Sequence, residues 1–164
     1  MGTPVLDATT AQVDFRLPVQ VNNSLLNNSG GGSINTNDAF IQTFEMTYSG
    51  AALPPWSVST TVTVPAAGSA GALLRLIPVQ YFPAILPSAG ATTSIVVNVR
   101  GHGVLTSQAL FTTAWYQVPV TVCAGCLAVL TCPAGSILAT CPLSAPGATS
   151  PGQTANVACI AGAP

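Results

Sequence analysis

Apolar and polar side chains alternate along most of the first 122 residues, and this period of two is typical of half-buried β-strands. The clearest segment is 56–64, where a face of Trp, Val and Thr alternates with a face of Ser and Thr. Residues 12–21 form another candidate, which Pro18 breaks. Because Pro is tolerated in strands mainly at edges, this strand is expected at a sheet edge. Further strands are expected at residues 38–48, 73–79, 92–100, 104–113 and 115–122, the last two as separate strands or as one bent strand.

Segment 38–48 is the first strong strand, and its alternation predicts two faces. One face is expected to hold Phe40, Phe44, Met46 and Tyr48, and the other Ile41, Thr43, Glu45 and Thr47.

Small and turn-forming residues separate the predicted strands. Residues 50–55 and 66–71 are expected to be turns, and the Pro-containing segment 80–90 an extended crossover. Gly101-His102-Gly103 is interpreted as a hairpin turn, because glycine supplies the positive φ that such turns need. His102 is therefore expected to be a solvated turn residue.

About seven strands separated by turns predict an all-β fold, an antiparallel immunoglobulin-like β-sandwich. Val118, Val120 and Val122 form the core face of its last strand, which runs directly into the cysteines. From Cys132 onward the alternation is lost, and Pro, Gly, Ala and Ser dominate. The expected division is a sandwich domain at 1–127 and an irregular, disulfide-tied tail at 128–164.

Charge is almost absent from this chain, since Asp, Glu, Lys and Arg make up 4% of it and the net charge is −1. With three arginines and no lysine there is no basic patch, so nucleic acid is not expected as a partner. Low charge also removes the repulsion between copies, which favours a secreted or self-associating protein. No apolar run approaches the roughly 18 residues of a membrane helix, so no membrane span is expected.

The five cysteines are the one group of residues that could form disulfides, bind a metal or support redox chemistry: Cys123, Cys126, Cys132, Cys141 and Cys159. Structural disulfides in an oxidising compartment are the favoured interpretation, because the tail cannot build its own core. A zinc site and a redox C-x-x-C motif remain alternatives. The first usually needs two close cysteine pairs, and the second normally opens a helix. With five cysteines, at least one is left over from pairing within the chain.

No catalytic residue, metal ligand or cofactor site is predicted. A Ser-His-Asp triad would require His102, a serine such as Ser107 and an aspartate to meet in space, and no G-x-S-x-G motif is present. The four carboxylates are widely spread in the sequence, and no two of them form a pair that could act in acid–base catalysis. A non-enzymatic protein is therefore expected.

Residues 22–37 form an Asn-rich polar segment, interpreted as a long surface loop. Asn22 and Asn27 lie in N-x-S sequons and are candidate glycosylation sites. Calcium is a weaker alternative, since Asp38 is the only carboxylate nearby. The aromatic residues that could form a carbohydrate-stacking platform are Trp56, Trp115, Tyr48 and Tyr116, although the face of Trp56 favours core packing for that residue.

Five segments carry a resemblance to a known group: N-N-S-L-L-N-N, N-T-N-D-A-F-I, V-N-V-R-G-H-G, Y-Q-V-P-V-T-V-C-A-G-C-L and S-P-G-Q-T-A-N-V-A-C. The chain resembles exported surface lipoproteins of myxobacteria and related soil bacteria, over about residues 12–160. Its most specific part is the C-x-G-C-L strand end. The resemblance implies a protein of the extracellular space or outer-membrane surface of a bacterium, with a lipid anchor expected in the full precursor. It implies no activity.

These observations lead to one expected function and two alternatives. The first is a non-enzymatic, exported structural or binding module of the cell surface. The second is a self-assembling subunit of an extracellular filament, in which the edge strand of residues 3–21 completes a neighbour's sheet. The third is a carbohydrate-binding sandwich with a cell-surface glycan as partner.

Overall fold

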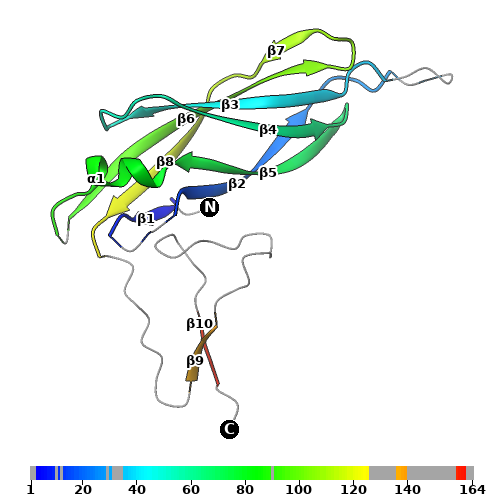
Figure 1. Cartoon of the computed structure of the whole chain (residues 1–164). Coiled ribbons are helices and arrows are strands. Elements are labelled where there is room, and N and C mark those ends of the chain that lie inside the picture. Colours follow the sequence, from blue (N-terminus) through cyan, green and yellow to red (C-terminus); the bar gives the residue numbers. More distant parts are fainter. Residues whose placement is uncertain are drawn as a thin grey trace. The chain divides into compact units, whose positions relative to one another are not determined.

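The computed structural model describes residues 3–9, 11, 13–28, 30, 35–89, 91–125, 136–139 and 158–161, the last two ranges by their backbone only. The described residues are mostly β-structure, with one short α-helix (Figure 1). No helix among them is long and apolar enough to span a membrane. The strands are β1 (Val5–Asp7), β2 (Phe15–Asn23), β3 (Ala39–Ser49), β4 (Trp56–Val64), β5 (Gly68–Ile77), β6 (Thr92–Leu105), β7 (Leu110–Thr112), β8 (Tyr116–Cys123), β9 (Ser136–Ala139) and β10 (Ala158–Ala161).

The chain divides into two compact units. The first comprises residues 1–16, 77–95 and 119–164, and the second comprises 17–76 and 96–118. The buried apolar residues of the first unit include Leu6, Phe15, Ile77, Phe82, Ile85, Ile95, Val120 and Val122. Those of the second include Ala39, Ile41, Phe44, Met46, Val62, Val64, Leu74, Leu76, Val97, Val99 and Val118. The expected division at residue 127 stays a prediction.

The largest sheet has the strand order β1-β8-β6-β3-β4, and β7 pairs with β6. β3 is antiparallel to both β4 and β6, as the alternation predicts. β1 is parallel to β8, with Val5 opposite Thr121 and Asp7 opposite Cys123. The expectation of an antiparallel sheet is therefore wrong at this edge. Three residues are too few to show the continuous apolar run of a parallel strand.

β2 and β5 form a separate two-stranded sheet. Pro18 lies inside β2 and does not end it, so the expected break is wrong. Among the described strands β2 pairs with β5 alone, which confirms its place at an edge, where the missing N–H of proline costs no ladder hydrogen bond. The turn expected at 66–71 is shorter, since β5 already begins at Gly68.

β3 contains a register shift between Ile41 and Thr43. Ile41 and Phe44 are both buried although they lie three residues apart. A β-bulge inserts one extra residue, and the alternation beyond it is reversed. The expected grouping of Phe40 with Phe44 is therefore wrong, and the residues that share the buried face are Ala39, Ile41, Phe44 and Met46.

β6 runs without interruption through Gly101-His102-Gly103, so the hairpin prediction is wrong. The chain reverses after Leu105 instead, where the N–H of Leu105 donates to the carbonyl of Ala109. Gly103 lies opposite Ile41, and a Cβ there would collide with the carbonyl oxygen of Phe40. Glycine is needed at this position for close backbone approach beneath the β3 bulge.

Segment 80–90 is not the extended crossover that its prolines suggested. A 3₁₀ turn, η2 (Val79–Tyr81), leads into the short helix α1 (Phe82–Ile85). Pro83 stands in the first turn of α1, where proline is tolerated because the N–H it lacks has no partner within the helix. Phe82 and Ile85 are buried and attach this turn to the first unit.

The backbones of β9 and β10 form a two-stranded antiparallel sheet, with Cys159 opposite Leu138. The segment 128–164 was expected to be irregular, and this expectation is wrong for β9 and β10. Short alternations such as S-I-L-A carry too little signal to predict a strand.

Candidate functional site

The second unit carries a charged cluster on the outward face of β3 and β6. Val97 and Val99 are buried, so alternation places Asn98, Arg100 and His102 on the opposite face of β6. On β3, beyond the bulge, Glu45 has the matching orientation and stands opposite Arg100 in the ladder. The bulge therefore decides which β3 side chains meet Arg100 and His102.

Glu45 is held by two nitrogen donors. The Nε of Arg100 donates to its Oε2 at 2.8 Å, and the Nε2 of His102 lies 3.1 Å from the same oxygen. The Nδ1 of His102 lies 3.1 Å from the Oγ1 of Thr112 on β7. With Trp115, these residues are called the Glu45 cluster: Glu45, Arg100, His102, Thr112 and Trp115.

Trp115 lies against Arg100, whose Cζ is 4.3 Å from the centre of the indole ring. At this distance the guanidinium makes a cation–π contact. Thr113, two residues before Trp115, is fixed to β6. Its Oγ1 accepts from the N–H of Gly101, and its N–H donates to the carbonyl of Gly101. Trp115 is 42% exposed, so part of the ring faces solvent.

The charge of Glu45 is stabilised by its neighbours. The hydrogen bond from Arg100, followed by that from His102, holds the pKa of Glu45 below its usual value. A general acid or base works best with a pKa near the operating pH, and this shift moves the carboxylate further from neutrality. The arrangement suits a fixed charge that orients Arg100.

A row of amides and hydroxyls continues the same face. The Nε2 of Gln117 donates to the Oδ1 of Asn98 at 3.2 Å. The Nδ2 of Asn98 donates to the Oγ of Ser49 at 3.2 Å and lies 3.4 Å from the Oγ1 of Thr47. Together with the Glu45 cluster, these groups form a polar face bordered by one exposed aromatic ring.

His102 is therefore a strand residue engaged with Glu45 and Thr112, and the solvated turn expected for it is wrong. The error followed from interpreting its flanking glycines as turn residues. The alternation of 95–99, if continued, would have placed Arg100 and His102 on one face. Their pairing with Glu45 depends on the register across a bulge, and no local pattern reports that register.

Asp38, the carboxylate considered for calcium, closes loops of the fold. Its Oδ1 accepts from the N–H of Ala66 at 2.8 Å and from the Nδ2 of Asn35 at 2.9 Å. Within the part of the chain that the structure describes, no group of three or more His, Cys, Asp or Glu side chains could hold a metal ion.

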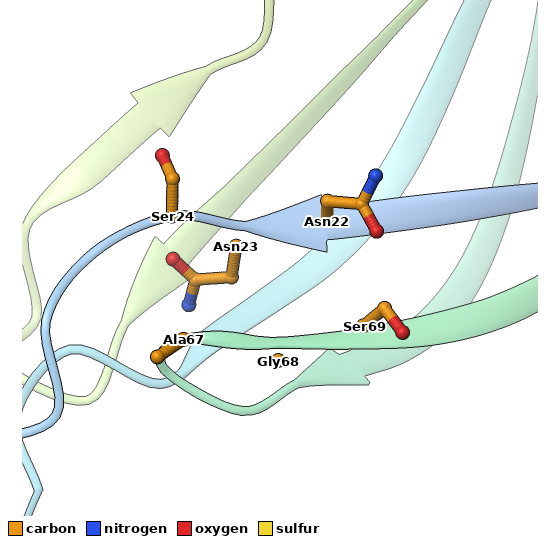
Figure 2. A pocket seen from close by; sticks show the side chains of 6 residues that line it. All are labelled: Asn22, Asn23, Ser24, Ala67, Gly68 and Ser69. Carbon is orange, nitrogen blue, oxygen red and sulfur yellow. The ribbon is translucent and has the colours of Figure 1, made fainter.

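The two sequon asparagines are both exposed, Asn22 at the end of β2 and Asn27 in the loop that follows. Asn22 borders an open pocket of about 450 Å³, while the amide of Asn23 turns inward and donates to the carbonyls of Asn37 and Val64 (Figure 2). Glycosylation stays a prediction. The residues that line this pocket are Asn22, Asn23, Ser24, Ala67, Gly68 and Ser69.

The other aromatic candidates divide into two kinds. Tyr48 is half-buried and its hydroxyl donates to the carbonyl of Leu76 at 2.8 Å. Trp56 is also half-buried, at the start of β4. Tyr116 is 64% exposed. Of the four predicted platform residues, Trp115 and Tyr116 are thus the two that solvent reaches most.

Cys123 is fully buried at the end of β8. The side chains of the other four candidates lie outside the described residues: Cys126, Cys132, Cys141 and Cys159. The disulfide pattern of the tail stays a prediction.

Asp7 is a buried carboxylate whose role the sequence did not indicate. It is fully buried in β1, and its Oδ1 accepts from the N–H of Gly125 at 3.0 Å and from the N–H and Oγ1 of Thr9 at 3.1 and 2.6 Å. Gly125 has a φ of +73°. We call Asp7, Thr9 and Gly125 the Asp7 knot. The sequence Asp7-Ala8-Thr9 is only a weak signal for an Asx turn. The contact between Asp7 and Gly125 spans 118 residues, so no local pattern could predict it.

This chain matches no protein-family model, and no curated protein or solved structure is significantly similar to it. The resemblance to surface lipoproteins therefore stays a prediction.

Proposed function

We propose that this protein is a non-enzymatic, exported binding module of the bacterial cell surface, built as an immunoglobulin-like sandwich with a disulfide-tied tail. The Glu45 cluster is the observation that carries the proposal. Its carboxylate is shared between two cationic or polar donors and its pKa is lowered, which favours recognition over proton transfer. Its side chains are partly exposed on a sheet face, where a ligand can reach them.

Export is supported by the cysteines. A disulfide at the buried Cys123 would fit an oxidising compartment, as would disulfides among the four cysteines that follow it in the sequence. The resemblance to exported surface lipoproteins points to the same location, with a lipid anchor in the precursor.

The test is intact-mass measurement of natively purified protein, alkylated under denaturing conditions without and with prior reduction. Two disulfides would leave one thiol to react before reduction and five after it. Five alkylated thiols in the unreduced sample would overturn the proposed compartment.

A neutral cell-surface glycan is the ligand class that the exposed ring of Trp115 favours. Sugar rings stack on indole faces through their C–H groups, and the neighbouring amides and hydroxyls of Asn98 and Gln117 can bond sugar hydroxyls. Binding would be measured by titrating neutral polysaccharides while following tryptophan fluorescence. Trp115→Ala should remove the response, whereas Tyr116→Ala serves as an exposed aromatic control. An unchanged response in Trp115→Ala would exclude this face.

The filament alternative was based on the near-absence of charge and on an exposed edge strand in the N-terminal segment. In the structure β1 pairs with β8 and β2 pairs with β5, so both described strands of segment 3–21 are already used within the chain. This counts against donation of that segment to a neighbour, and it directs attention to the other sheet edges.

A further inference from the structure

β4 is the terminal strand of the largest sheet. In the described part of the chain β3 is the one strand hydrogen-bonded to it, so its other edge makes no ladder with a described strand. The edge of a sheet presents backbone N–H and C=O groups that can pair with another chain.

The other described edges carry features that discourage such pairing, and β4 does not. Proteins protect edges with charges, with proline or by keeping the strand short. β2 contains Arg16 and Pro18, and β5 contains Arg75. The other edge strands are short: β1 and β7 have three residues each, and β9 and β10 have four. β4 has nine residues, W-S-V-S-T-T-V-T-V, without charge, proline or glycine. Segments of high β-propensity and no charge are those that pair most readily between chains.

The sequence of β4 also reads nearly the same from either end. When two copies are placed antiparallel about Thr60, every position meets a residue of its own kind. Hydroxyl residues meet hydroxyl residues and large apolar residues meet large apolar residues on the same faces, so both copies keep their inward and outward sides. The pairs are Trp56 with Val64, Ser57 with Thr63, Val58 with Val62, Ser59 with Thr61, and Thr60 with itself.

We propose that β4 is a docking strand for β4 of a second copy of this chain, antiparallel about a two-fold axis at Thr60. The interface is isologous, so it closes at a dimer and does not propagate. A second copy is the partner for two reasons. The edge carries no charge that would select a different strand, and the near-palindromic sequence of β4 is complementary to an antiparallel copy of itself.

The local structure of β4 permits this pairing. Its register against β3 shifts between Ser59 and Val62, but exposure alternates along the whole of β4, with outward positions such as Ser59 and Thr61 exposed. Nine residues span about 30 Å. Strand pairing alone buries less than the roughly 1,200 Å² of a typical stable interface, so the dimer is expected to form reversibly at high concentration.

The test is sedimentation velocity of the full chain between 10 µM and 1 mM, with two variants that differ only in the sign of one charge. In the antiparallel pair, Ser59 of each copy meets Thr61 of the other. Ser59→Lys with Thr61→Lys therefore places like charges opposite each other twice, and should weaken dimerisation about tenfold. Ser59→Lys with Thr61→Glu places opposite charges there and should dimerise at least as well as the unmodified chain.

Ser107→Lys, at an exposed turn away from β4, is the control for an added charge, and circular dichroism verifies that each variant is folded. A parallel pairing in register would bring like charges together in both double variants, so only the antiparallel arrangement separates them. A chain that stays monomeric at 1 mM, or double variants that associate equally, would overturn the proposal.

Discussion

Asp7 and Glu45 are two carboxylates with opposite surroundings. Asp7 is 0% exposed and accepts from two backbone N–H groups and one hydroxyl. The side chain of Glu45 is 26% exposed, and it is engaged by Arg100 and His102, whose own side chains also reach solvent. In a chain with only four acidic residues, one is therefore buried and bonded to the backbone, and another remains partly accessible to solvent.

The physical difference lies in the burial of the carboxyl group and in the number of backbone and hydroxyl groups that it binds. Asp7 is fully buried and accepts three hydrogen bonds, which contribute about 1 kcal/mol each. The guanidinium of Arg100 is on a long side chain that water can solvate in place of Glu45, and a partly exposed ion pair contributes little to stability.

The largest effect is expected for Asp7→Ala. It removes the acceptor of three hydrogen bonds in a buried site and should lower the free energy of unfolding by about 3 kcal/mol. Urea unfolding monitored by circular dichroism measures this. Asp14→Ala is the matched control, because the Oδ1 of Asp14 accepts the N–H of Val79 at an exposed position. If Asp7→Ala and Asp14→Ala lower the free energy of unfolding equally, the Asp7 knot contributes no more to stability than an exposed carboxylate does.

Gly125→Ala comes next and tests the backbone of the same knot. At a φ of +73° an L-residue is strained, and the cost should be about 1 kcal/mol. Gly71→Ala is a close control, since a Cβ meets nothing within 4 Å at either glycine and only Gly125 has a positive φ. Gly71 is in β5, where alanine should be neutral or slightly stabilising. If both variants unfold at the same urea concentration, strain at Gly125 is not limiting.

The sequence predicted the structure well where apolar and polar residues alternate regularly. Strong alternation located β3, β4 and β8 almost to the residue, because burial of one face fixes that period. Prediction was wrong where a backbone event interrupts the period. The bulge near Gln42 reversed the faces of β3. Gly101 and Gly103 were interpreted as turn residues, but they lie within β6, where they let β3 approach closely.

The two carboxylate sites were missed for a related reason. Glu45 meets Arg100 across 55 residues, and Asp7 meets Gly125 across 118. Each contact is set by strand order and register, which depend on tertiary packing and leave no local motif. Composition could show that charges were few, which makes each one informative once its neighbours are known.

Glu45→Gln should have a much smaller effect than Asp7→Ala. The amide can still accept from Arg100, and the lost ion pair is partly exposed, so the free energy of unfolding should fall by about 0.5 kcal/mol. Urea unfolding at pH 7 measures it, and 1 M NaCl should reduce the difference because salt screens the pair. A loss comparable with that of Asp7→Ala would mean that the Glu45 cluster is a structural site and not an open one.

The smallest expected effect is the pH dependence of that difference. Arg100, and after it His102, hold the pKa of Glu45 below the usual 4.5, so the folded protein binds this proton less readily than the unfolded chain does. The stability that Glu45 adds is therefore fully present above about pH 4.5 and is lost as the pH falls through the lower folded pKa. Urea unfolding of the unmodified chain and of Glu45→Gln at pH 7, 5 and 3 should give curves that differ at pH 7 and 5 and approach each other at pH 3. Curves that diverge further on acidification would mean that the carboxylate is destabilised in the fold, and that Arg100 does not hold it as an ion pair.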